Sequence, residues 1–254
     1  LLSIDTNATA TIRGDAQVNS ATTVDVDAIN TQRVVSVAEA GGSSDSVGVE
    51  GAVAVDTLTN RSIAAIDDDA RIDALGDIGL SATADLENIS VGGGVVATKG
   101  PVGIGFSVSI NTIDSTVAAY LGNFDPLGVD TAPALGSLHT DGAINLTALN
   151  DISQGAYSVV GAIATNSKAQ SDVPADASTT QDGGSTAGKN KAGQGKFGIA
   201  VSGDVALNDI SADTRASITD GVSVTGATDV SLDATTDLSL SALSGAATLS
   251  FQSE

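Results

Sequence analysis

Apolar and polar residues alternate with a period of two along most of this chain. In one stretch the apolar residues Ile78, Leu80 and Ala82 are separated by Gly79 and Ser81. Such alternation is typical of a β-strand that buries one face, because successive side chains point to opposite sides of the strand. Convincing helical spacing is missing everywhere. The pattern therefore predicts an all-β protein built from strands with one buried apolar face.

The strand pattern itself repeats along the chain. The stretch that begins at Ala64 recurs 54 positions earlier, from Ala10, and 152 positions later, from Ala216. A further copy is split: its start matches at Ala118-Ala119-Tyr120 and its end at Ile144-Asn145-Leu146-Thr147-Ala148. Downstream, one column of the repeat holds Asp85, Asp151 and Asp237.

Each copy has one small apolar face that it cannot bury alone, whereas stacked copies bury a continuous core. We therefore predict a parallel β-solenoid (β-helix) of about four degenerate copies of about 50 residues each. An array of β-sandwiches is the alternative, because strands spaced about ten residues apart would fit it too. The copies form one continuous array over residues 1–254, and their bounds are 1–46, 47–101, 102–164 and 197–254. Two surface loops, at 123–134 and 165–196, are inserted into this array.

The junctions between copies are rich in glycine. The apolar run that ends in Gly92-Gly93-Gly94-Val95-Val96 is followed by Thr98-Lys99-Gly100-Pro101 and then by a second apolar run from Val102. This order predicts a Gly-rich hairpin that protrudes from the coil. All the lysines of the chain lie at such predicted tips, namely Lys99, Lys168, Lys189, Lys191 and Lys196.

Composition narrows the class of protein further. Aromatic residues make up only 2% of the chain and Trp is absent, which suits thin stacked layers better than an irregular globular core. The formal net charge of −21 argues against nucleic acid as a partner, since phosphate binding needs clustered Lys and Arg. The absence of Cys excludes disulfides and thiol chemistry, and no apolar run approaches the roughly 20 residues of a membrane-spanning helix. Because the chain lacks an initiator Met and a signal peptide, we expect it to be an internal segment of a longer protein.

Two stretches carry a family resemblance. They are Asn208-Asp209-Ile210-Ser211-Ala212-Asp213-Thr214-Arg215-Ala216-Ser217-Ile218-Thr219-Asp220-Gly221 and Gly76-Asp77-Ile78-Gly79-Leu80-Ser81-Ala82. At these columns the chain resembles the repeats of very large bacterial filamentous adhesins, the haemagglutinin-like and leukotoxin-like surface proteins. The resemblance implies a repeat architecture at the bacterial cell surface. It implies no catalytic residues in this region.

Candidate chemistry is sparse. The only histidine, His139, lies in Ser137-Leu138-His139-Thr140-Asp141-Gly142, which lacks the Gly-x-Ser-x-Gly elbow of a serine hydrolase. The stronger candidate is a calcium site at Asp67, Asp68 and Asp69, because hard cations prefer oxygen ligands. Against it, the equivalent turn of the first copy reads Arg13-Gly14-Asp15, so the carboxylates do not recur. Acidic turns that face water explain the same residues.

These observations favour a non-catalytic structural segment of an elongated extracellular bacterial surface protein, an adhesin or a filament subunit. Its expected partners are neighbouring repeats or subunits of the same protein, together with host, cell-surface or glycan ligands. The alternative is a ligand-binding adhesin module that acts through calcium, glycan or ice. A polysaccharide lyase ranks last, since no isolated group of acidic or basic residues interrupts the repeat. We expect no cofactor other than calcium.

Overall fold

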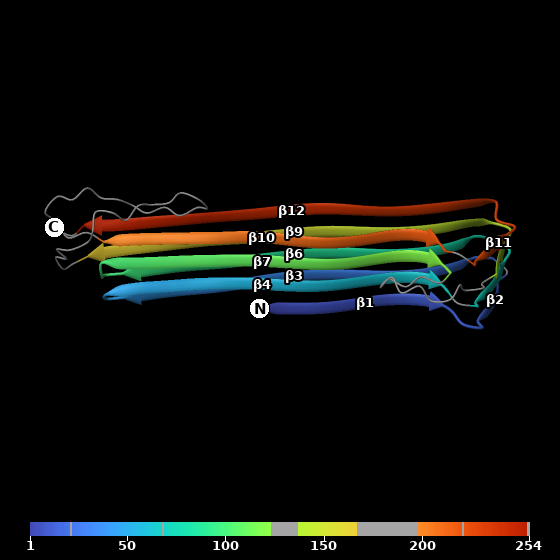
Figure 1. Ribbon diagram of the computed structural model, residues 1–254, viewed down its shortest axis with the longest axis horizontal. Coiled ribbons are helices and arrows are strands. Elements are labelled where there is room, and N and C mark those ends of the chain that lie inside the picture. Colours follow the sequence, from blue (N-terminus) through green and yellow to red (C-terminus); the bar gives the residue numbers. More distant parts are fainter. Residues whose placement is uncertain (21, 68, 123–136, 167–197, 220, 253–254) are drawn as a thin grey trace.

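The computed structural model describes the chain except for residues 21, 68, 123–136, 167–197, 220 and 253–254 (Figure 1). The described residues form strands joined by short turns. In chain order the strands are β1 (Leu2–Ile12), β2 (Gln17–Ser20), β3 (Val24–Ser44), β4 (Val47–Ile66), β5 (Arg71–Ala74), β6 (Ile78–Thr98), β7 (Val102–Leu121), β8 (Ser137–Thr140), β9 (Ala143–Asn166), β10 (Ile199–Ile218), β11 (Ser223–Thr225) and β12 (Asp229–Gln252).

The strands form three sheets in which every pairing is parallel. Sheet A has the order β1-β4-β7-β10, sheet B the order β11-β8-β5-β2, and sheet C the order β12-β9-β6-β3. Each turn of the coil, or rung, therefore contributes a strand to each of the three sheets. The predicted parallel β-solenoid of about four copies is confirmed. The sandwich array is not what the chain forms, because sandwich sheets are antiparallel.

The rungs are flat and wide. Strands of sheets A and C run to about 20 residues, or roughly 65 Å at 3.3 Å per residue, whereas those of sheet B have three or four. Sheets A and C pack face to face along their length, and sheet B closes the coil at one end only (Figure 1). We call the closed end the body and the opposite end, where β3 and β6 turn back into sheet A and β9 ends, the tip.

Equivalent residues stack in register from rung to rung. Ala10 pairs with Ala64, Ala64 with Ala119, and Ala119 with Ala216. The predicted column of Asp85, Asp151 and Asp237 is likewise in register. The ladders therefore follow the sequence repeat.

One part of the predicted alignment is wrong by one residue. Tyr120 was expected in the column of Ile66, but Ile66 pairs with Leu121 and Tyr120 pairs with Ala65. The shift follows from the period of the strand, since a slip of one residue moves a side chain to the other face. Leu121 faces the core, whereas Tyr120 packs with Ile63 and Ala118 in a separate cluster on the outer face of sheet A.

The predicted hairpins at the tip are also corrected. The chain does reverse at Ser44–Val47 and Thr98–Val102, but the two arms of each turn belong to different sheets. A hairpin pairs its own two arms, whereas here each arm pairs with the equivalent arm of the neighbouring rung. The junctions are therefore arches that connect sheet C to sheet A. The inserted loop at 123–134 lies outside the described residues, as does nearly all of the one at 165–196.

The main apolar core fills the body. There the inward residues of the three sheets meet, as at Ile66, Ile72 and Ile78, and they are almost fully buried. A second cluster, nearer the middle of the rungs, joins Leu58, Leu86, Ile113 and Ile152 across sheets A and C. The residues are small or medium-sized because two sheets packed face to face leave a layer only about 10 Å thick.

Core and surface leucines of one strand provide a test of this packing. Leu146 is 1% exposed in the column of Leu80, whereas Leu149 of the same strand is 39% exposed on the outer face. Leu146→Ala should lower the free energy of unfolding by about 2–5 kcal/mol through lost burial and a cavity. Leu149→Ala should lower it by less than about 1 kcal/mol. Urea unfolding followed by circular dichroism measures both, and equal losses would contradict the assigned faces.

Candidate functional site

The predicted calcium residues lie in the turn between β4 and β5. The backbone N–H of Asp67 donates a hydrogen bond to the carbonyl of Ile12, 2.8 Å away in the rung below, so the turn stacks on its neighbour. Asp69 is exposed, and Asp68 lies outside the described residues. Among the residues that the structure describes, no group of three or more His, Cys, Asp and Glu is arranged to hold a metal. The calcium site therefore stays a prediction.

His139 lies on the short strand β8, beside Thr225 of the next rung. Its Nδ1 is 3.2 Å from Thr225 Oγ1, and its Nε2 is 3.8 Å from Asp141 Oδ1. The order hydroxyl, imidazole, carboxylate superficially resembles a hydrolytic triad. However, the side chains of His139 and Asp141 are 48% and 61% exposed, so water competes for each contact. The arrangement is a surface contact between rungs.

A chain of polar side chains runs through the interior along the solenoid axis. It crosses repeatedly between sheets A and C, with one step from Asn60 to Ser115 within sheet A, and it joins all the rungs. Its members are Thr6, Asn30, Asn60, Ser115, Asn150, Thr214 and Thr236, and we call it the axial ladder.

The geometry of the axial ladder is regular. Asn60 Nδ2 donates to Ser115 Oγ over 3.1 Å, and Ser115 Oγ donates to Asn150 Oδ1 over 3.0 Å. These groups are buried, at 0–1% exposure. Buried amides and hydroxyls stabilise a structure when they are hydrogen-bonded and destabilise it when they are not. The ladder therefore holds sheets A and C in one register.

A second polar layer lies nearer the tip and is not joined in this way. Asn88 and Gln154 are adjacent in one inward column of sheet C, below Leu240 and above Val34. Both are at most 1% exposed, and neither side chain amide has a hydrogen-bond partner within the described residues. This layer therefore contains buried amide groups that form no hydrogen bonds with the described residues.

The two layers predict opposite effects for one kind of substitution. Asn88→Leu and Gln154→Leu should each raise the free energy of unfolding by about 1–3 kcal/mol, because an unpaired buried amide is replaced by an apolar group. Asn60→Leu should lower it by a similar amount, since Asn30 and Ser115 lose their partner. Urea unfolding distinguishes the two; destabilisation by Asn88→Leu would show that its amide is paired, for example by buried water.

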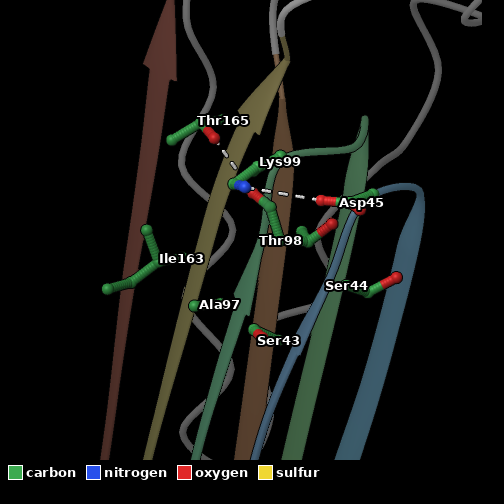
Figure 2. Close-up of a pocket in the computed structure, with 8 residues that line it drawn as sticks. All are labelled: Ser43, Ser44, Asp45, Ala97, Thr98, Lys99, Ile163 and Thr165. Atoms are coloured by element: carbon green, nitrogen blue, oxygen red, sulfur yellow. Dashed lines mark hydrogen bonds and ion pairs between the residues drawn. The ribbon is translucent and has the colours of Figure 1, made fainter.

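The tip contains a small cavity of about 240 Å³ (Figure 2), lined by Ser43, Ser44, Asp45, Ala97, Thr98, Lys99, Ile163 and Thr165. Lys99 Nζ reaches Asp45 Oδ1 at 3.5 Å, but these side chains are 80% and 91% exposed. An ion pair so open to water contributes little to stability or binding. The polar groups that line the cavity are hydroxyl groups and this one exposed ion pair.

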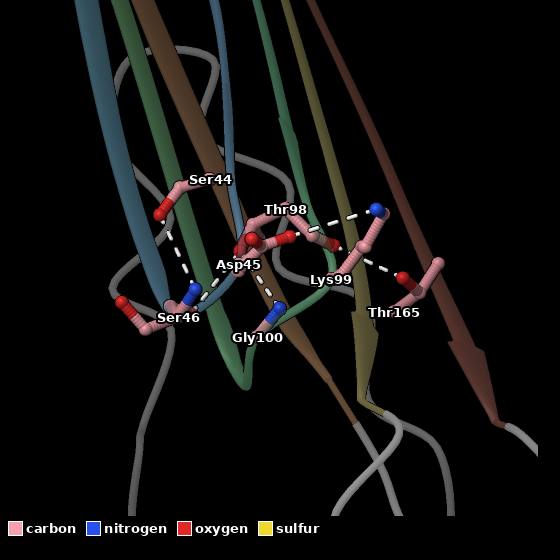
Figure 3. Close-up of polar contacts among 7 residues, drawn as sticks. All are labelled: Ser44, Asp45, Ser46, Thr98, Lys99, Gly100 and Thr165. Atoms are coloured by element: carbon pink, nitrogen blue, oxygen red, sulfur yellow. Dashed lines mark hydrogen bonds and ion pairs between the residues drawn. The ribbon is translucent and has the colours of Figure 1, made fainter.

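Most of the polar groups at the tip join one arch to the next (Figure 3). Thr98 Oγ1 donates to the Ser46 carbonyl over 3.1 Å and accepts the Gly100 N–H over 2.9 Å, while Thr165 Oγ1 donates to the Thr98 carbonyl over 3.1 Å. A Cβ at Gly100 would lie 1.3 Å from the Ser46 carbonyl oxygen, so only glycine allows the arches to stack this closely. The cavity is a by-product of arch stacking.

The outer surface differs sharply between the two ends of the rungs. Toward the body, most outward positions of sheets A and C are polar, with acidic residues such as Asp85, Asp114 and Asp151; the Tyr120 cluster and Leu149 are apolar exceptions. Toward the tip, beyond Val35 in sheet C and Val55 in sheet A, the outward positions are mostly apolar or glycine. The inward positions there are mostly glycine, serine and alanine, and they also include buried Val96 and Asp204. The tip half is thus apolar outside and mostly small or polar inside.

This reversal corrects the prediction that the apolar face of every strand is buried. In β6 the apolar positions change phase between Leu86, which faces in, and Ile89, which faces out. In β7 the same change occurs between Ile110 and Ile113. The sequence contains a signal of this change: at each of these points two apolar residues lie three positions apart, which breaks the two-residue alternation.

No protein-family model, curated protein or solved structure matches this chain. In the part of the chain that the structure describes, no helix is long and apolar enough to cross a membrane.

Proposed function

We propose that this chain is a structural, non-catalytic segment of an elongated extracellular bacterial surface protein, an adhesin or filament subunit. The observation that carries the proposal is the in-register stacking of every strand on its equivalent in the next rung. In this arrangement the backbone hydrogen bonds run parallel to the solenoid axis. A load along that axis is then shared by many bonds in each rung, which suits a stiff rod or fibre.

The last rung adds support for growth along the axis. Inward residues of β12 such as Leu232 and Leu238 are 49% and 45% exposed, whereas Leu146 and Ile152, their partners in β9, are at most 1% exposed. An exposed row of inward leucines is a surface on which a further rung would stack. In a filament this rung would come from the same protein or from a neighbouring subunit.

Electron microscopy of the native surface material tests the proposal. We expect long, thin fibres whose diffraction contains an axial reflection at about 4.8 Å, the spacing of hydrogen-bonded strands. Compact particles without that reflection would contradict it.

A calcium-dependent, glycan-binding or ice-binding module is the alternative function. Thermal melting in the presence of calcium and in the presence of a chelator distinguishes a calcium-dependent module from a structural rod. For a rod we expect equal melting temperatures in both conditions, because its stability comes from the ladders and the core. A melting temperature raised by calcium in the parent chain but not in Asp67→Asn/Asp69→Asn would instead support the predicted site.

A further inference from the structure

The outward positions of β4, β7 and β10 in the tip half form an uninterrupted apolar surface, which we call the A face. All of its positions are aliphatic, aromatic or glycine: Val47, Val49, Gly51, Val53, Val55, Val102, Ile104, Phe106, Val108, Ile110, Ile199, Val201, Gly203, Val205 and Leu207. Several are half exposed, including Val49 at 57% and Val205 at 53%. A contiguous apolar patch with a polar rim marks an interaction site.

The A face is also flat. Phe106, in the middle strand, lies over Gly51, where an added Cβ would meet the ring at 2.0 Å. The ring therefore fills the depression left by the glycine. A flat surface of valine, isoleucine and leucine is the surface that packs against another β-sheet about 10 Å away.

From these features we propose that the A face packs against the A face of a second copy of this chain. Lipid is a poorer occupant, because the net charge of −21 repels anionic membranes. The sheet C surface of the tip half is less suited, since Glu39 is exposed within it.

The charge distribution selects the orientation of the two copies. The outward acidic residues of sheet A lie on its body half, at positions such as Asp114 and Asp209. If two copies overlapped in parallel along their whole length, these like charges would face one another. An antiparallel arrangement, in which only the tip halves overlap, places the acidic halves at opposite ends. The two-fold axis then passes near Phe106, and Ile104 of one copy lies over Val108 of the other.

The size of the A face makes this a weak contact. Ten residues along each of three strands cover roughly 33 Å by 14 Å, or about 450–500 Å² per copy. A stable dimer buries about 800 Å² per partner. Association of the isolated chain should therefore depend on concentration and appear only at high concentration.

Sedimentation equilibrium of the full chain, with matched variants, tests the association. Val53→Lys/Val205→Lys places two charges on the A face and should weaken self-association at least tenfold, because the lysines lose water without gaining a partner. Thr59→Lys/Ser211→Lys adds the same charges to the same two strands on the body half, beside Asp114, and should leave association intact. Circular dichroism verifies that both variants fold. A parent chain that stays monomeric at its highest soluble concentration, or equal loss in both variants, would overturn the proposal.

Cross-linking tests the orientation, and the absence of Cys makes single thiols unambiguous. An equimolar mixture of Ile104→Cys and Val108→Cys chains, treated with a short bis-maleimide, should give well over twice as much of the mixed dimer as of either homodimer; twice is the ratio for random pairing. A mixed dimer at or below that ratio would overturn the antiparallel arrangement.

Two further measurements address other occupants of the A face. Val205→Cys, diluted to the monomer, should react rapidly with a bulky maleimide; slow reaction would show that part of the same chain covers the face and would overturn the proposal. Phosphatidylcholine vesicles should not capture the parent chain in flotation. Capture that Val53→Lys/Val205→Lys abolishes would identify lipid as the occupant instead.

Discussion

Parallel stacking of one rung on the next is the constraint on which the rest of this structure depends. Because hydrogen-bonded strands lie about 4.8 Å apart, each inward position favours side chains of similar size directly above and below it. The column of Ile12, Ile66, Leu121 and Ile218 meets this demand with residues of similar size. Outward columns are less restricted, and Asp85, Asp151 and Asp237 stack like charges there because water and ions screen them.

The interior also illustrates how a thin solenoid positions its two large sheets. An apolar layer alone would allow sheets A and C to slide past each other with little penalty. The axial ladder restricts such sliding, because any shift would break buried hydrogen bonds between the sheets, such as that between Ser115 of sheet A and Asn150 of sheet C. Asn88 and Gln154 give no such benefit in their layer, so polarity inside this protein stabilises it only where the side chains meet.

Much of the fold was predictable from the sequence because stacking leaves its mark directly in the residue columns. The recurrence of Ala10 at Ala64 and at Ala216 predicted the repeat, and the aspartate column predicted the register of sheet C. The arches could not be told from hairpins, since both need a Gly-rich reversal and differ only in which strands pair. Alternation likewise shows that the two faces of a strand differ, but not which face meets the partner sheet. The apolar exterior of the tip half was missed for that reason.

The candidate sites were predicted less well for a related reason. Asp67 and its neighbours are adjacent in sequence, but a metal site depends on the direction and spacing of oxygen atoms that adjacency does not determine. The A face, by contrast, gathers residues from three strands separated by up to about 150 positions, and it becomes visible only when the rungs are stacked.

The register of sheet A has a consequence for how such a chain can change over evolution. Successive members of the Ile12 column are 54, 55 and 97 residues apart, yet their strands pair without interruption. Additional sequence is therefore accommodated between strands and leaves the hydrogen-bonded ladders unaltered. A gene encoding this architecture can gain or lose peptide segments at its corners and arches while the scaffold is conserved, so surface variation and mechanical integrity are free to evolve separately.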